Sequence, residues 1–461
     1  MTTSLSLAAR WGVLLLACPM LGRADSLAEL RTELDALKTG YEQRIHELEQ
    51  RISQLESDAS AGQTRSAAPA APAASLAAGS GANAFNPSMS LILAGTYAQL
   101  SRDPADFRIA GFMPSDEQAG PGARGFNLGE SELTIAANVD PYFYGNVTAS
   151  VSGENAISIE EAFFRTTALT HGFTLKGGRF FSALGYLNEV HSHAWDFVDQ
   201  PLAYQALLGN QYTQDGAQLK WLAPTDMFVE LGVEGGSGRH FPGTTRSANG
   251  LNSAVAFMHL GHDVGDSASW RSGLSLLRTN AEARRFAASD AASVPVTNRF
   301  DGSSRTWVAD FTWKWSPHGN PTLHQLKLQG EYLRRTEDGT LTFDADARGL
   351  IGPWHSTQSG WYVQSVYQFL PRWRAGLRYD SLDSGSAPVG LLPGGVPYSF
   401  AFPDLQAAAP TRTSVMLDFN LSEFSRLRTQ YAWDQSRPGA ADRQLFLQYL
   451  FSLGAHGAHQ F

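Results

Sequence analysis

Apolar and polar residues alternate along several stretches of this chain, most regularly between Arg443 and Leu453. After Arg443, every second residue is apolar: Leu445, Leu447, Tyr449, Phe451 and Leu453. A period of two over about ten residues predicts a β-strand with one uniformly apolar face. About ten residues is also the length that a tilted strand needs to cross a bilayer.

The same alternation recurs in earlier segments. Residues 307–315, 373–379 and 427–433 place apolar side chains on one face, with Thr429 as an exception, and mostly charged or polar side chains on the other. In a soluble sandwich the apolar face would pack against a second sheet. In an outer-membrane barrel it would face lipid, and the charges would line a wet lumen. The alternation alone does not distinguish these two folds.

The lengths of the connections between the predicted strands do distinguish them. Short turns are predicted at 140–141, 169–172, 224–226, 263–267, 316–322, 371 and 422–425. Between them come mostly longer connections, at 100–125, 182–214, 237–250, 279–304, 336–357 and 381–411, with short exceptions at 152–156 and 436–442. Short periplasmic turns and long outer loops are typical of a membrane barrel, whereas a sandwich has no reason to sort its loops by length. We therefore predict an all-β fold, a transmembrane antiparallel up-and-down β-barrel of about 16 strands.

Composition agrees with a membrane protein built from strands. The chain has 461 residues and a mean hydropathy of -0.22. It has no run of about 18 apolar residues, so no transmembrane helix is predicted. Tyrosine and tryptophan near strand ends predict an aromatic girdle at the membrane interfaces: Tyr142, Tyr144, Trp221, Trp313, Trp315, Trp361, Trp373 and Trp433. The net charge of -9 argues against a nucleic-acid partner.

Residues 1–24 have the features of a secretory signal peptide. Arg10 precedes an apolar run over 11–17, and Gly22-Arg23-Ala24 forms a small-x-small cleavage site. The only cysteine, Cys18, lies within this segment. The alternative is a lipoprotein, since the residues before Cys18 resemble a lipobox. Cleavage after Ala24 would leave an exported protein with no thiol and therefore no disulfide.

Residues 25–58 form a different kind of segment. Leu, Ile and Tyr recur there at three-four spacing, with a four-residue step from Tyr41 to Ile45. This pattern predicts a self-associating coiled coil, in the periplasm; a solvated helix packed on a neighbour is the alternative. Residues 59–84, rich in Ala, Pro, Gly and Ser, predict a flexible linker. The barrel would then occupy residues 85–461.

Several segments carry a resemblance to Gram-negative outer-membrane porins: 86–91, 129–133, 140–145, 178–181 with 188–199, and 453–461. The chain is similar in plan to phosphate-selective, trimeric porins. It also resembles a coiled-coil-bearing proteobacterial family often labelled zinc-regulated TonB-dependent outer-membrane receptors. The resemblance implies a homotrimer in outer-membrane lipid that passes small polar solutes. Phe461 matches the aromatic C-terminus by which the barrel-assembly machinery recognises such barrels.

The predicted connection over 182–214 holds the candidates for a channel constriction, because in porins the corresponding loop folds into the lumen. It carries Glu189, Asp196 and Asp199 and no Lys or Arg. Strand parity places five arginines on the inner face: Arg372, Arg374, Arg378, Arg426 and Arg428. Opposed acidic and basic walls would create a transverse field that orients polar solutes. The alternative is that these are ordinary lumen charges without selectivity.

The sequence also bears on metal binding and on catalysis. In the same connection, His191, His193 and Asp196 form His-x-His-x-x-Asp, a set that could bind zinc with an open coordination position. Alternatively, these side chains hydrogen-bond within a packed loop or line the pore. No Gly-x-Ser-x-Gly or similar nucleophile motif stands out, so we predict that the chain is not an enzyme. The predicted function is a water-filled porin; the alternatives are zinc uptake or binding, and a structural tether of the envelope.

Overall fold

The computed structural model describes residues 87–115, 120–153, 156–244 and 249–454. The signal peptide, coiled coil and linker predicted over residues 1–84 lie outside these ranges, as does Phe461. The described residues belong to the second of two compact units, Gly81–Phe461. Within the described residues there is no helix both long and apolar enough to cross a membrane.

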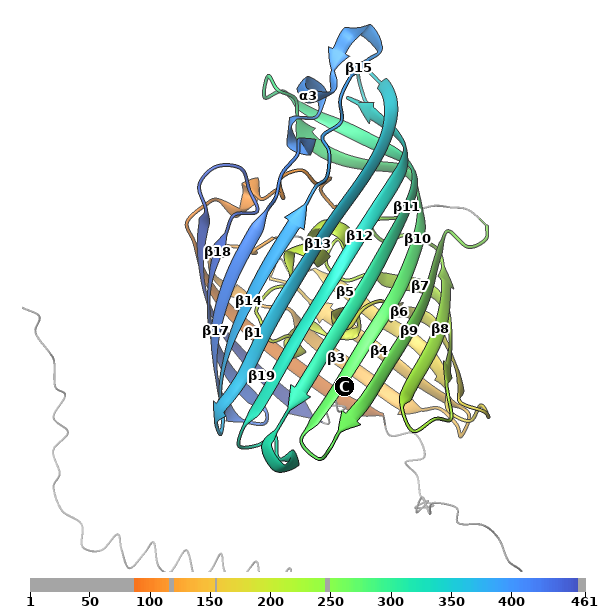
Figure 1. Cartoon of the computed structure of the whole chain (residues 1–461), viewed down its shortest axis with the longest axis vertical. Helices are drawn as coiled ribbons and strands as arrows, with labels where there is room; N and C mark the ends of the chain where they lie inside the picture. The colour runs from red at the N-terminus through yellow and green to blue at the C-terminus, as the bar shows by residue number, and fades with distance from the viewer. Residues whose placement is uncertain (1–86, 116–119, 154–155, 245–248, 455–461) are drawn as a thin grey trace, which may run out of the picture. The chain divides into compact units, whose positions relative to one another are not determined.

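The described residues form one closed antiparallel β-barrel (Figure 1). Its sheet contains 17 strands and closes where β1 pairs with β19 on one side and with β2 and β3 on the other. Only Gly129 and Glu130 separate β2 from β3, so these two form one spanning strand, and the barrel has 16 spanning strands. The predicted barrel and its strand number are confirmed.

The strands of the barrel have the following bounds: β1 Ser88–Leu100, β2 Gly125–Leu128, β3 Ser131–Asn138, β4 Phe143–Val151, β5 Ile157–Thr166, β6 Phe173–Phe181, β7 Thr213–Leu222, β8 Phe228–Gly236, β9 Ser253–Val264, β10 Ala268–Ser289, β11 Pro295–Trp315, β12 Gln325–Phe343, β13 Leu350–Leu370, β14 Trp373–Asp383, β17 Thr411–Ser422, β18 Ser425–Asp434 and β19 Asp442–Gly454. A two-stranded hairpin, β15 Leu391–Leu392 and β16 Val396–Pro397, and two short helices, α2 Leu202–Leu208 and α3 Tyr398–Ala401, lie in the connections. Single 3-10 turns occur at Pro104–Asp106, Leu187–Glu189, Ser192–Ala194, Pro317–Gly319, Pro393–Gly395 and Pro403–Leu405.

All the predicted short turns lie between strands, at one end of the barrel. The β3–β4 turn shows why its sequence turns there: Asp140 Oδ1 accepts hydrogen bonds from the backbone N–H groups of Tyr142 (2.7 Å) and Phe143 (2.8 Å). An aspartate that bonds the backbone two residues ahead stabilises a tight turn. In the β13–β14 turn, Arg372 takes a positive φ of 71°.

Two predicted long loops, 279–304 and 336–357, are wrong. Strands β10, β11, β12 and β13 are 22, 21, 19 and 21 residues long and leave connections of only 290–294 and 344–349. Figure 1 shows these four strands rising above the rest of the barrel. Beyond the apolar belt, outward side chains need not be apolar, so the alternation that identifies a membrane strand weakens there. The inner face of these upper strand parts is covered by the connection between β14 and β17. The two pack together in a cluster that includes Phe300, Phe343 and Phe402.

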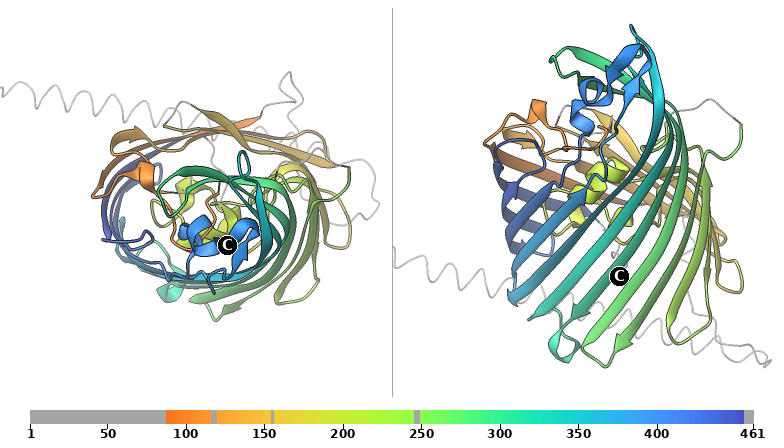
Figure 2. Two further views of the ribbon diagram at one scale, coloured as in Figure 1. Left: turned by 90° about the horizontal axis from the view of Figure 1, so that it is seen from above. Right: turned by 45° about the horizontal axis from the view of Figure 1, so that its top comes forward.

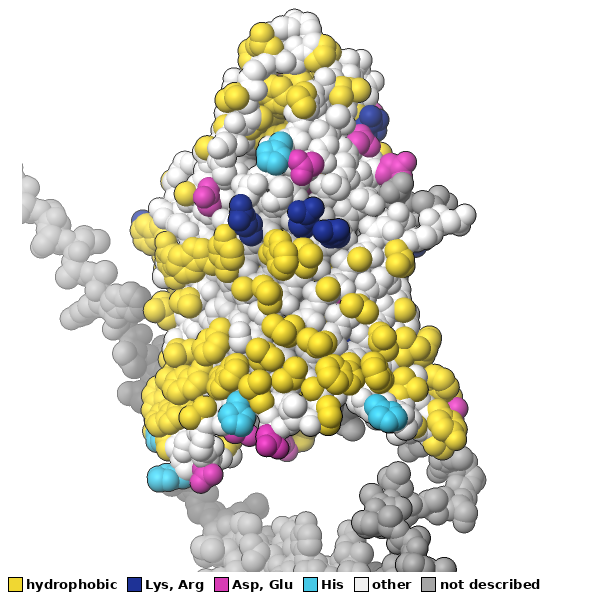
Figure 3. Space-filling model, turned by 45° about the vertical axis from the view of Figure 1, so that its right-hand side comes forward, with side chains coloured by type: hydrophobic (Ala, Val, Ile, Leu, Met, Phe, Trp, Pro, Cys, Tyr) yellow, Lys and Arg dark blue, Asp and Glu magenta, His cyan; other side chains and the backbone are white. Residues whose placement is uncertain are grey.

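The outer wall carries an apolar belt (Figure 3). Every spanning strand contributes an outward apolar side chain that is at least 38% exposed: Leu93, Leu133, Val147, Phe164, Leu175, Leu219, Val233, Met258, Leu274, Phe311, Leu328, Val363, Leu377, Leu417, Leu427 and Leu447. In β19 the parity is as predicted, since Leu447 is exposed and its neighbour Phe446 is buried. Tyr144 does not belong to the predicted outer girdle, because its ring contacts the inward-facing Phe163 and Arg165.

Candidate functional site

The connection between β6 and β7, residues 182–212, lies inside the barrel (Figure 2). We call it the inward loop. All seven residues of α2 are buried. They pack with Ala183, Leu184 and Leu187 against apolar side chains of the inner wall: Val255, Phe257, Leu277, Val308, Leu333 and Leu382. This apolar inner face was not predicted, because a lumen was expected to be polar.

Two buried glutamates of the inner wall hold the start of the inward loop. Glu234 accepts hydrogen bonds from Ser182 Oγ (2.6 Å) and the Ala183 N–H (2.9 Å). Glu331 accepts from the N–H groups of Tyr186 (3.1 Å) and Leu187 (3.0 Å) and from the hydroxyl of Tyr204 (2.8 Å). Hydrogen bonds between buried groups fix a segment in place, because each donor or acceptor left without a partner would be costly.

Gly185 makes this approach to Glu331 possible. Its φ is +69°, and a Cβ there would lie 2.4 Å from Glu331 Oε2. A side chain at position 185 would therefore both strain the backbone and displace the carboxylate. Sequence reasoning did not select Glu234 or Glu331; the available signal was a glutamate at an inward parity position of a barrel strand.

The acidic residues Asp196 and Asp199 bind the arginines that they were expected to face across an open lumen. Asp199 pairs with Arg378 (2.8 Å) and with Arg412 (2.6 Å). Asp196 pairs with Lys327 (3.0 Å) and Arg374 (3.3 Å). The predicted pair of separated walls is thus corrected: acid and base are in contact, and together they fasten the loop to β12, β14 and β17.

Burial opposes ionisation of both aspartates, but the neighbouring cations outweigh it. Lys327 and Arg374 hold the pKa of Asp196 below its usual value, and Arg412 and Arg378 do the same for the pKa of Asp199. Both side chains therefore carry a full negative charge at neutral pH.

The other predicted constriction residues have different roles. Arg426 donates to the carbonyl of His193 (2.7 Å), and Arg428 donates to the carbonyl of Trp195 (2.9 Å) while pairing with Asp418. Arg372 is exposed in the β13–β14 turn, so the structure does not bring it to the loop. Arg412 of β17, which was not predicted, contacts the loop through Asp199. It lies on the same face of β17 as Asp418, and this shared face was the sequence signal that it points inward.

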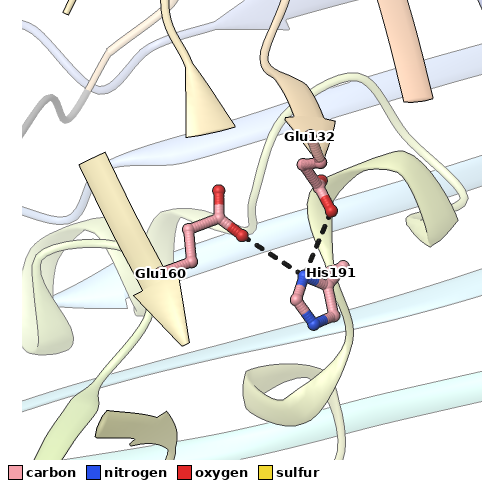
Figure 4. Close-up of side chains that lie close together, drawn as sticks. All are labelled: Glu132, Glu160 and His191. Carbon is pink, nitrogen blue, oxygen red and sulfur yellow. Dashed lines mark hydrogen bonds and ion pairs between the residues drawn. The ribbon is translucent and has the colours of Figure 1, made fainter. Parts of the chain in front are cut away.

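His191 and His193 do not meet Asp196. Instead they contact glutamates of the barrel wall; Figure 4 shows His191 with Glu132 and Glu160. His191 Nδ1 lies 3.2 Å from Glu132 Oε2 and 3.2 Å from Glu160 Oε2, and its Nε2 lies 3.1 Å from Glu161 Oε2. Consecutive glutamates reach one imidazole because a β-bulge in β5, at the pairing with Thr148 and Ala149, directs both side chains inward.

Burial alone would lower the pKa of His191, but its hydrogen bonds to Glu132, Glu160 and Glu161 outweigh burial and raise its pKa well above the usual value. His193 Nδ1 lies 2.9 Å from both oxygens of Glu132. The proposed His-x-His-x-x-Asp ligand set is therefore corrected: the turn at Ser192–Ala194 sends Asp196 towards Lys327, away from the histidines.

A cavity of about 1140 Å³ lies between the inward loop and the wall formed by β5 to β10. Tyr186, Glu189 and Val190 of the loop line one side of it. Its lining also includes Asp226 and Asp263, so it reaches the end of the barrel that carries the short turns. The cations of the lining are Arg165, Lys176, Lys220 and Arg271, and Glu161, Glu189 and Glu230 are further acids there. Glu189 therefore belongs to this cavity and not to the arginine network of Asp196 and Asp199.

Comparison with known proteins gives one relative by sequence. No protein-family model matches the chain. A protein of Aquifex aeolicus (strain VF5), described as an uncharacterized protein, is 31% identical over 359 residues, which cover 73% of this chain and 70% of that protein. The chain belongs to the family of this Aquifex aeolicus protein. Since that relative carries no described activity, family membership does not assign one here.

Solved structures with a similar barrel include three outer-membrane proteins. The channel DcaP of Acinetobacter baumannii is 13% identical, with 80% of this chain and 97% of that chain covered and a TM-score of 0.48. OmpT of Vibrio cholerae in its trimer form is 11% identical, with 80% and 99% covered and a TM-score of 0.47. OprB of Pseudomonas putida is 11% identical, with 80% and 94% covered and a TM-score of 0.47.

Proposed function

We propose that the chain is an outer-membrane porin, a channel for passive diffusion of small polar or charged solutes. The observation that carries this proposal is the combination of the outer apolar belt with a charged internal cavity in one closed barrel. A continuous apolar surface of this extent is unfavourable in water but matches lipid. A closed barrel also satisfies every strand edge, as a bilayer requires.

The orientation follows from the connections. The short turns face the periplasm and the long connections face the exterior of a Gram-negative cell, as is usual for outer-membrane barrels. With this orientation, we expect the predicted coiled coil and Phe461 on the periplasmic side. Recognition of Phe461 by the barrel-assembly machinery and the absence of enzymatic activity stay predictions.

The inward loop is the proposed constriction. It contacts β3 and β5 through its histidines, β8 and β12 through Glu234 and Glu331, and β14 and β17 through Asp199. A loop fastened around the wall in this way leaves a narrow route, and the charged cavity is the part of that route open to the periplasmic end. Asp196, Asp199, Arg374, Arg378, Arg426 and Arg428 shape the constriction by holding the loop, and Glu189 faces the solute.

Conductance across a planar lipid bilayer tests the proposed function. The refolded chain should form water-filled channels whose current rises with salt concentration. A folded, inserted barrel that conducts no ions would contradict the porin and favour the structural tether, which does not need an open route.

Arg165 and Lys176 supply a prediction about selectivity. They lie directly opposite each other on β5 and β6 and both line the cavity. Like charges opposite each other destabilise a sheet, so this pair does not serve stability. Two neighbouring positive charges in the cavity wall would instead attract anionic solutes. Changing both to glutamate should shift permeability from anions towards cations by about fivefold or more. One unit charge at 4 Å changes the energy of a passing ion by about 1 kcal/mol even in water, which corresponds to a factor of about 5.

The measurement is the reversal potential in a salt gradient. Arg278→Glu is the matched control, because Arg278 is exposed in β10 at an outward parity position. It should leave the reversal potential unchanged. An unchanged reversal potential in the double variant would mean that the cavity is not on the ion route.

We also propose a homotrimer in which three coiled-coil segments associate beneath the membrane. Linkers of residues 59–84 would hold the three helices at roughly millimolar local concentration. A cysteine introduced at Leu48, a predicted core position of the coil, should then give covalent oligomers in intact cells. Deleting residues 26–58 should leave single-channel conductance normal and make the oligomer less resistant to heat. Monomers alone after crosslinking would show that the helix packs elsewhere.

A further inference from the structure

The contacts of His191 leave an excess of acceptors over hydrogens. An imidazole nitrogen carries at most one hydrogen, yet Nδ1 of His191 faces carboxylate oxygens of both Glu132 and Glu160, each at 3.2 Å. The Glu160 carboxyl has another acid, Glu130, as a side-chain hydrogen-bond partner, and Glu130 also interacts with Glu132. Several acidic groups thus converge beside one imidazole.

The spacing of these atoms fits a metal ion. One ligand atom each from Glu132, Glu160 and His191 lies within 4.8 Å of the others. Two of the separations, from Nδ1 to the two glutamate oxygens, are 3.2 Å. A tetrahedral zinc ion with bonds of about 2.1 Å has ligands about 3.4 Å apart. A small adjustment of the Glu132 and Glu160 side chains would therefore complete three sides of such a site, with a fourth position left open.

The surroundings have the arrangement that orients metal ligands. A metal-bound histidine usually donates its other ring N–H to a carboxylate; here Nε2 of His191 faces Glu161 at 3.1 Å. Glu132 is held by Ser192 Oγ (3.0 Å) and by His193 Nδ1 (2.9 Å). The side chains are mostly buried, with 1% of Glu132, 11% of Glu160 and 19% of His191 exposed.

An entry path exists as well. Glu161 and Val190 line the cavity beneath the inward loop, and His191 follows Val190 in the chain. A cation that enters the cavity from the short-turn end can therefore reach the edge of the cluster.

We propose that Glu132, Glu160 and His191 bind a divalent transition-metal cation, with Glu161 and His193 orienting the ligands. One imidazole with two carboxylates favours zinc or a similar borderline ion over Ca²⁺ and Mg²⁺, which prefer oxygen ligands alone. The bound ion would join the inward loop to β3 and β5. The site does not depend on the proposed channel function, since binding can occur whether or not the barrel conducts.

The test is a calorimetric titration of the refolded full chain, freed of metal by a chelator, with zinc chloride alone. We expect one saturable zinc ion per chain, and a higher midpoint of thermal unfolding when zinc is present. Glu160→Gln and His191→Gln should abolish this binding, and Glu161→Gln should weaken it by about 10–100-fold, the usual effect of losing an orienting partner.

His355→Gln and Glu423→Gln are the matched controls, because both residues are exposed at a distance in the chain from the cluster. Both should bind zinc as the unaltered chain does. Heat-modifiable migration on a gel checks that each variant is folded; if His191→Gln does not fold, the Glu160→Gln result decides. Absence of zinc binding in the unaltered chain, or binding that survives in folded Glu160→Gln, would overturn the proposal. Conductance measured in parallel keeps this outcome separate from that of the porin.

Discussion

Leu447→Arg is expected to destabilise the barrel in lipid by about 2–4 kcal/mol, the cost of an arginine on the lipid face near the bilayer midplane. Leu447 is 47% exposed on the outer wall, in the middle of β19. It lies in register with Tyr97 of β1 and Thr429 of β18, and Thr429 with Leu417 of β17. An arginine there would have no water or anion within reach. The free energy of unfolding from lipid vesicles in urea measures the effect.

Leu453→Arg is the matched control for this change. Leu453 lies on the same strand and is similarly exposed at 44%, but it is next to the end of β19. Since the cost of a charge falls to about 0–1 kcal/mol near the interface, this variant should unfold almost as the unaltered chain does. An equal loss of unfolding free energy at both positions would show that the effect of an arginine on the outer belt does not depend on its depth in the membrane.

Asp199→Ala is expected to have an effect of similar size from inside the barrel. The change removes the carboxylate that pairs with Arg378 and Arg412, whose side chains are 1% and 3% exposed. Leaving a buried charge without its partner typically costs about 3–5 kcal/mol. Asp380 still pairs with Arg378 at 3.1 Å, so we expect the lower end of this range. Because Asp199 fastens the inward loop, single-channel conductance should also rise.

Two further variants isolate the cause. Glu189→Ala alters an acid of the same loop that faces the cavity, and it should leave the free energy of unfolding nearly unchanged. Both arginines also pair with the buried Asp380. Adding Arg378→Met, Arg412→Met and Asp380→Asn to Asp199→Ala should therefore recover much of the lost stability, since replacement of a whole buried ion network by uncharged side chains is often tolerated. If this combined variant is as unstable as Asp199→Ala, the loss does not come from unpaired arginines.

The pH dependence has a defined sign. Because the pKa of Asp199 and Asp196 is lower in the folded chain, their contribution is fully present above the usual aspartate value of 3.8 and is lost as the pH falls through the folded values. Loosening of the inward loop by this route is therefore expected only in strong acid.

Strand position and facing could be predicted because both depend on neighbouring residues. In β19 the alternation of Leu447 with Phe446 identifies the face of each side chain, and Asp140 closes the β3–β4 turn because its side-chain Oδ1 accepts hydrogen bonds from the next residues' backbone. The same rule failed for the upper parts of β10 to β13. There the outward face meets no lipid, so a two-residue period of apolar side chains is not required.

Within the candidate site, sequence parity identified Arg374, Arg378, Arg426 and Arg428 as inward residues. The resemblance to porins indicated that residues 182–214 form the loop that enters the barrel. Neither could select the partner of each side chain. Asp199 meets Arg412, which is more than 200 residues away in the chain, only because the barrel closes and the loop crosses its interior. The sequence alone thus determined the barrel, its short turns and the inward face of the strands, since these follow from local periodicity and turn residues. Only the tertiary structure decided that Asp196 leaves the histidines and that Glu132 and Glu160 approach His191, because these contacts depend on the β-bulge, the register of distant strands and the path of the inward loop.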